Sequence, residues 1–223
     1  MDGTELTALV SMLCPRLRKL SIQVLLVAVS DVSIRSDTVE SLWFHVENIG
    51  RLDFVTPRLE VLNASRAIEV HISAPKLAEV VWNNGTYDPR LHQFTDASRH
   101  LRLLDISCNS LVASLLQRFD TVGKLKLSVS ISQGIAEYNS FLSETNKLPN
   151  CENLSVYSVW NHHGLARTML HLLRNCNSIR KFSLMLVDGP YPSLVISQIL
   201  RSIVIFLTLV SNVLNDCGIS LVI

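Results

Sequence analysis

The feature that most constrains this chain is a hydrophobic pattern that recurs every 18 to 29 residues. The pattern is apolar-x-x-apolar-x-apolar, and a single copy says little, because strands and helices both contain it by chance. Eight copies at a period of about 20 to 30 residues predict a solenoid, in which each unit adds one strand to a parallel sheet. The copies are Leu17-Leu20-Ile22, Val39-Leu42-Phe44, Leu59-Leu62-Ala64, Leu77-Val80-Trp82, Leu101-Leu104-Ile106, Val122-Leu125-Leu127, Cys151-Leu154-Val156 and Ile179-Phe182-Leu184.

Three copies share a start signal. Pro15, Pro57 and Pro75 each stand two residues before the first apolar position of a copy. Proline fixes φ and lacks a backbone donor, so it is tolerated at the start of a strand but not within a ladder. A repeated start signal supports repeated units.

The connecting segments differ along the chain. Apolar residues at helical spacing predict helices in three of them. Between Phe44 and Trp82 the connections are short and rich in β-branched residues, which predicts extended or turn-like structure there. The helical sets are Leu6, Leu9, Val10 and Leu13 after a cap at Thr4; Leu111, Leu115 and Phe119 after Ser110; and Leu165, Met169, Leu172 and Leu173 before Cys176.

These patterns predict an α/β fold, a leucine-rich-repeat solenoid of seven or eight irregular units over residues 1–186 with a parallel inner sheet. Residues 187–223 form a divergent apolar tail. The stretch from Leu194 to Val210 is strongly apolar, but Gln198 and Arg201 interrupt it. We expect it to cap the open end of the solenoid, and a membrane-associated, tail-anchored protein is the alternative.

The sequence contains no motif that indicates catalysis. It has no GxSxG, GxxxxGK[ST] or GxGxxG run. His162, His163 and His171 lack the i, i+4 spacing of helical metal ligands, since Arg167 stands four residues after His163. We therefore expect no enzyme activity, no cofactor and no metal.

Net charge and cysteine spacing indicate which partners the protein can bind and in which cellular compartment it resides. The net charge is +1, with 20 Lys and Arg against 19 Asp and Glu, so nucleic acid is not an expected partner. Five scattered cysteines without a CxxC pair indicate reduced thiols. The acidic first residues do not resemble a secretory signal, and we expect a cytoplasmic or nuclear protein.

The strand pattern also predicts which side chains the sheet exposes. Because side chains alternate along a strand, the residues between the apolar positions should line the concave face. Exposed aromatic residues on a rigid sheet are typical anchors of protein interfaces, and lysines favour an acidic partner. The candidate protein-binding residues are Trp43, His45, Lys124, Lys126 and Tyr157. A register shifted by one residue would instead bury Trp43.

The chain resembles the C-terminal repeat regions of plant F-box/leucine-rich-repeat proteins, particularly the large cereal-type group. The resemblance rests on the runs CPRLRKLSI, TPRLEVL and APKLAEV, and above all on residues Leu148 to Leu186, and it covers roughly 15 to 186. That last block is similar to the family's "LP-x-C-x-x-L" strand, His-Gly turn, "LL-R-x-C" helix and "I-R-K-F-x-L" strand.

The resemblance implies a substrate-recognition role in a cullin-RING (SCF) ubiquitin ligase. In that family the F-box docks on the ligase adaptor and the repeats hold the target protein. No F-box counterpart precedes Cys14. We therefore expect a protein-binding module that meets the adaptor only if an F-box is supplied elsewhere, or else a truncated product without a stable function.

Overall fold

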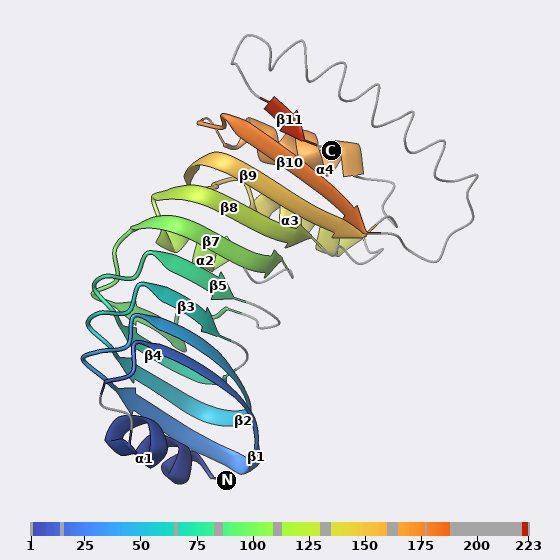
Figure 1. Cartoon of the computed structure of the whole chain (residues 1–223). Helices are drawn as coiled ribbons and strands as arrows, with labels where there is room; N and C mark the ends of the chain where they lie inside the picture. Colours follow the sequence, from blue (N-terminus) through green and yellow to red (C-terminus); the bar gives the residue numbers. More distant parts are fainter. Residues whose placement is uncertain are drawn as a thin grey trace.

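The computed structural model describes residues 2–13, 16–64, 67–82, 87–108, 113–129, 135–159, 165–176, 178–187 and 220–222. Most of the strands stack one above another along the molecule, and a helix lies at the N-terminal end of the stack (Figure 1). The helices are α1 (Gly3–Leu13), α2 (Ala113–Arg118), α3 (Ile135–Glu144) and α4 (Leu165–Arg174). The strands are β1 (Lys19–Arg35), β2 (Ser41–Val55), β3 (Val61–Ala64), β4 (Glu69–Ser73), β5 (Glu79–Trp82), β6 (His92–Thr95), β7 (His100–Cys108), β8 (Thr121–Val129), β9 (Asn150–Val159), β10 (Lys181–Val187) and β11 (Ser220–Val222).

The eight apolar patterns lie in one parallel sheet, here called the long sheet. Its strands follow in the order β1, β2, β3, β5, β7, β8, β9 and β10, and equivalent pattern positions pair directly. Leu42 lies opposite both Leu20 and Leu62, and Leu125 opposite both Leu104 and Leu154. The predicted parallel-sheet solenoid is therefore confirmed, together with the strand register.

A second, smaller sheet forms because β1 and β2 are long and bend. Their first halves belong to the long sheet, whereas residues 51–55 of β2 pair with β4, which in turn pairs with β6. At the corner, Asn48 adopts a positive φ of 63° and its side chain donates to the Leu26 carbonyl at 2.9 Å. The expectation of extended connections between Phe44 and Trp82 is thereby confirmed.

Gly50 allows a close approach at the same corner. The carboxylate of Asp31 accepts a hydrogen bond from the Arg51 backbone N–H at 2.9 Å. A Cβ on Gly50 would lie 2.9 Å from that carboxylate, so a larger residue would displace it. The corner therefore depends on a short-range fit between the two bent strands.

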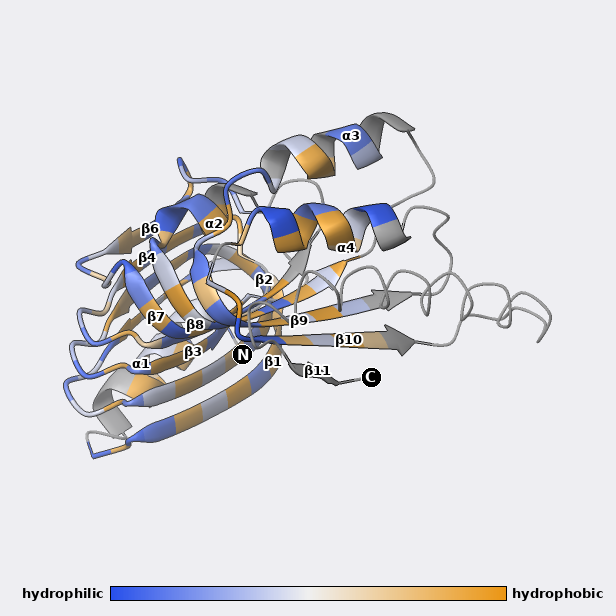
Figure 2. Ribbon diagram, turned by 90° about the horizontal axis from the view of Figure 1, so that it is seen from above, coloured by the Kyte–Doolittle hydropathy of each residue, from blue (hydrophilic) through white to orange (hydrophobic). Residues whose placement is uncertain are grey.

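Beyond β6 the layer opposite the long sheet becomes helical. Arg118 of α2 donates to the carbonyls of Phe94 and Ala97, and the Phe119 ring packs edge-on against Phe94 at 6.1 Å. Helices α2, α3 and α4 lie along one side of the sheet (Figure 2). The core is thus enclosed between the long sheet and an outer layer of strands, then helices.

Three of the four helices in the described part of the chain lie where the sequence predicts them, although Ser110 and Leu111 of the second predicted helix lie outside the described residues; α3 was not predicted. The cap of α1 is Asp2 rather than Thr4, and that prediction was wrong. The Asp2 carboxylate accepts from the Glu5 N–H at 2.8 Å, while Glu5 accepts from the Asp2 N–H at 3.0 Å. This reciprocal capping box satisfies two backbone donors that a helix start would otherwise leave unpaired.

Helix α1 closes the N-terminal end of the core. Leu6 and Val10 are buried, and the Thr7 hydroxyl accepts a hydrogen bond from the Ser33 N–H of β1 at 3.1 Å. This contact satisfies a backbone donor on the outer edge of β1, whose one strand partner among the described residues is β2. At the other end, β11 pairs with residues 181–183 of β10.

The apolar stretch Leu194 to Val210 lies outside the described residues, and so does most of the tail expected from residue 187 onward. Val187 itself is the last residue of β10, and Ser220–Val222 join the long sheet. Among the helices that the structure describes, none has the length and apolar character needed to span a bilayer.

Candidate protein-binding face

The side chains between the buried pattern positions form one face of the long sheet, here called the exposed face. It is opposite the core, because every described pattern residue from Phe44 to Leu184 is buried while its neighbours in the strand are half-buried or exposed. Strand pairing arranges these neighbours in rows across the sheet. The first row is Lys19, Ser41, Val61, Glu79, Leu103, Lys124, Asn153 and Lys181; the second is Ser21, Trp43, Asn63, Val81, Asp105, Lys126, Ser155 and Ser183.

Trp43 and His45 form an aromatic patch at one end of this face. Their ring centroids lie 4.4 Å apart, and the His45 Nε2 lies within hydrogen-bonding distance of the Asn63 side-chain oxygen at 3.3 Å. Both side chains are half-buried, whereas Trp82 points inward and is buried. The alternative register, with Trp43 in the core, is therefore wrong.

Two lysines remain free of ion pairs on the other half of the face. Lys124 and Lys181 are exposed, lie on either side of Asn153 in the pairing register, and make no ion pair within the described part of the chain. Lys126 differs, because its Nζ contacts the Asp105 carboxylate at 3.1 Å. Its charge is thus already balanced, and Lys124 and Lys181 provide the unbalanced positive charge.

Tyr157 completes the second patch. It lies opposite Ser128 and Met185 in the register, and Met185 is 57% exposed. The five predicted residues consequently do not form a single cluster. Trp43 and His45 on β2 are separated from Lys124, Lys126 and Tyr157 on β8 and β9 by the three strands β3, β5 and β7. Lys181 and Met185 extend the second patch and were not among the five candidates.

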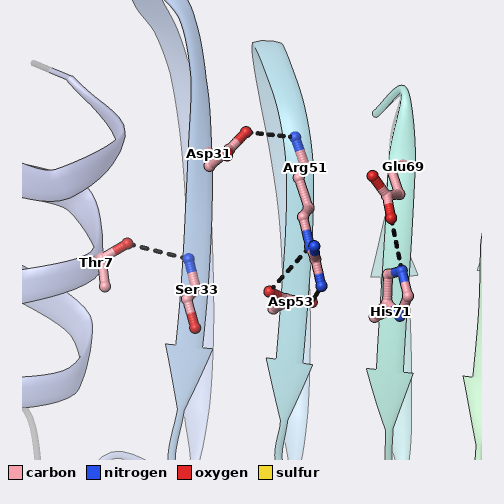
Figure 3. A network of polar contacts seen from close by, with 7 residues as sticks. All are labelled: Thr7, Asp31, Ser33, Arg51, Asp53, Glu69 and His71. Carbon is pink, nitrogen blue, oxygen red and sulfur yellow. Dashed lines mark hydrogen bonds and ion pairs between the residues drawn. The ribbon is translucent and has the colours of Figure 1, made fainter.

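An open groove of about 650 Å³ lies beside α1, on the outer side of the second sheet. Its polar groups already bind one another (Figure 3): Asp31 accepts from the Arg51 backbone, and the Arg51 side chain contacts Asp53 at 3.3 Å. Thr7 accepts from Ser33 on the same wall. These contacts hold α1 and the bent strands in place, so we assign the groove a structural role.

The same region brings Ser33, Asp53 and His71 into one row, on three neighbouring strands. A Ser-His-Asp triad needs the histidine between the other two, so that it can take the serine proton. Here the aspartate stands in the middle, and the His71 Nε2 contacts Glu69 at 2.8 Å instead (Figure 3). This row therefore lacks the geometry of a nucleophile and its base.

The buried histidine has a structural role. His92 packs against Trp82 and Tyr87, and its Nδ1 accepts a hydrogen bond from the Asp88 N–H at 2.9 Å. Burial lowers the pKa of His92, which favours the neutral ring that this hydrogen bond requires. Burial likewise lowers the pKa of His171, whose Nε2 lies 3.0 Å from the Thr145 hydroxyl.

His162 and His163 lie outside the described residues. Within the described ranges, no three His, Cys, Asp or Glu side chains gather as a metal site would require.

Comparison with known proteins identifies no relative: no family model, no curated protein and no solved structure matches the chain. The family resemblance of the repeats and the leucine-rich-repeat identity therefore remain predictions from the sequence.

Proposed function

We propose that the protein is a non-catalytic recognition module of leucine-rich-repeat type, and that its exposed face binds an acidic segment of a partner protein. The observation that carries this proposal is the pair Lys124 and Lys181, two exposed and unbalanced cations held on a rigid sheet. Electrostatic complementarity of this kind favours encounter with acidic partners and discriminates against basic ones.

The aromatic patch supplies the second element of recognition. Trp43 and His45 stand on the same face, and a half-buried tryptophan offers apolar area with little side-chain entropy to lose on binding. Tyr157 does the same on β9, and the exposed Met185 opposite it on β10 adds apolar area, two rows from Lys124 and Lys181. A partner that spans several strands can reach both patches, whereas a small molecule would contact only one of them.

The resemblance of residues 148–186 to F-box/leucine-rich-repeat proteins suggests the biological setting. In this proposal the module presents a target protein to a ubiquitin ligase, and an F-box from another source supplies the contact with the ligase adaptor. Ligase assembly rests on the resemblance alone, while recognition of an acidic segment rests on the face itself. Recognition of an acidic segment can therefore be tested independently of ligase assembly.

Selection from a random peptide library displayed on phage tests this proposal, with the full chain as bait. Lys124 and Lys181 are two strand spacings apart, about 10 Å. Residues two and four apart on one side of an extended peptide are separated by about 7 Å and about 13 Å, so the long lysine side chains can reach carboxylates at either spacing. We expect acidic residues at that spacing and an apolar residue among the selected peptides. Enrichment of basic or uncharged peptides would contradict the proposal. So would a selection in which no peptide stays bound at 0.15 M salt.

A further inference from the structure

Two buried cysteines meet where α4 joins the long sheet. Cys151 is the first pattern residue of β9, and Cys176 lies in the turn after α4; their exposed fractions are 1% and 4%. Their Sγ atoms lie 2.8 Å apart. A disulfide bond is about 2.05 Å long, so the two sulfurs need to approach by only about 0.8 Å to form one.

The two thiols are chemically unequal. The hydrogen bond with Cys151 lowers the pKa of the Cys176 thiol, while burial acts in the opposite direction and raises it. The pKa of Cys151 is raised by the neighbouring Cys176 and by burial. Cys176 is also the more exposed residue of the pair, at 4% against 1%, so it is the thiol that a soluble disulfide reaches first, and Cys151 is the resolving thiol.

We propose that Cys151 and Cys176 are a modification site that forms a reversible disulfide with a low-molecular-weight disulfide, such as oxidised glutathione, as the oxidant. The Cys176 thiolate attacks one glutathione sulfur and releases the first reduced glutathione. Cys151 then attacks the Cys176 sulfur, and the second reduced glutathione leaves. Two protein thiols are oxidised, one glutathione disulfide is reduced, and the two thiol protons end on the two glutathiones.

The bond would fasten α4 to β9, the strand that carries Asn153 and Tyr157 of the exposed face. It would close a loop of about 25 residues, which constrains the unfolded chain. Oxidation should therefore stabilise the C-terminal part of the solenoid. This inference is independent of the proposed function.

The test uses the full chain carrying Cys14→Ser, Cys108→Ser and Cys217→Ser, which leaves only the proposed pair. After equilibration with oxidised glutathione, trypsin should release peptide 148–167 joined to peptide 175–180, since cleavage follows Lys147, Arg167, Arg174 and Arg180. We expect the Tm to rise by about 5–10 °C and to return to its starting value with dithiothreitol.

Cys176→Ser in the same background is the matched control, and oxidation should not change its Tm. A second control is the same oxidation in denaturant, where the folded arrangement is lost and the joined peptide should form far less readily. The proposal fails if the folded protein keeps two alkylatable thiols, if it accumulates glutathione on either cysteine, or if pairing is no faster than in the unfolded chain.

Discussion

Phe44→Ala is expected to lower the free energy of unfolding by about 3–5 kcal/mol, the range for truncating a fully buried phenylalanine. Phe44 has no exposed surface, and its ring packs edge-on against Phe54 at 5.3 Å. Phe54 belongs to the half of β2 that pairs with the second sheet, so this contact joins the two sheets across the core. Urea denaturation followed by circular dichroism measures the change.

Trp43→Ala is the matched control for this prediction, because Trp43 precedes Phe44 and faces the opposite side of the strand. Loss of the half-buried Trp43 should cost about 1 kcal/mol, mainly through its contact with His45. If the strand register were shifted by one residue, Trp43 would be buried and Phe44 exposed, and Trp43→Ala would then cost more stability than Phe44→Ala. If Trp43→Ala destabilised the protein as much as Phe44→Ala, the exposed face would have been assigned to the wrong side.

Combining Lys124→Glu with Lys181→Glu should weaken binding of a selected acidic peptide by roughly 60-fold. Each exposed ion pair contributes about 0.2–1 kcal/mol, and reversal replaces attraction with repulsion of similar size. The two sites together lose about 0.8–4 kcal/mol, and the midpoint of about 2.4 kcal/mol corresponds to roughly 60-fold in Kd. Isothermal titration calorimetry at 0.15 M salt measures it.

Lys76→Glu with Lys147→Glu provides a control of identical net charge. Both lysines are exposed, but they lie in turns outside the rows of the exposed face. This variant should bind the peptide within about twofold of the unchanged protein, because screening limits the effect of distant surface charges. Equal losses in the two variants would show that binding follows net charge, and the proposed face would be rejected.

The register of the long sheet could be predicted from the sequence because a solenoid repeats one contact. Once Leu42 and Phe44 are recognised as equivalent to Leu62 and Ala64, their pairing follows without knowledge of the connections. The same register places Lys126 opposite Asp105, so their ion pair was also implicit in the pattern. The unbalanced charge of Lys124 and Lys181 could have been inferred in the same way.

The bend of β1 and β2 was not predictable from periodicity. It depends on three residues that act between the two strands. Asn48 and Asp31 each make one side-chain hydrogen bond to the backbone of the other strand, and Gly50 permits a close approach to Asp31. Helix α3 was missed for a different reason. Its Tyr138, Phe141 and Leu142 are helically spaced, but they lie in the 29-residue interval between two apolar patterns and no clear helix-start signal precedes them.

The contact between Cys151 and Cys176 was missed because it depends on how α4 docks against β9. Scattered cysteines without a short-range motif indicate isolated thiols, and 24 residues separate these two. Only the packing of a helix on a particular strand brings them together. Repeated strand contacts can thus be deduced from the sequence, whereas contacts between the two layers need the structure.

The proposed binding face requires that β2 and β10 belong to one continuous sheet, since only then do the two patches lie on the same face. Double electron–electron resonance between genetically encoded nitroxide residues at Ser41 and Lys181 measures this. Both lie in the same row, six strand spacings apart, which gives about 29 Å from a spacing of about 4.8 Å. We predict a narrow distribution centred at about 25–35 Å. A broad distribution, or a centre beyond about 45 Å, would contradict the continuous sheet and with it the proposed face.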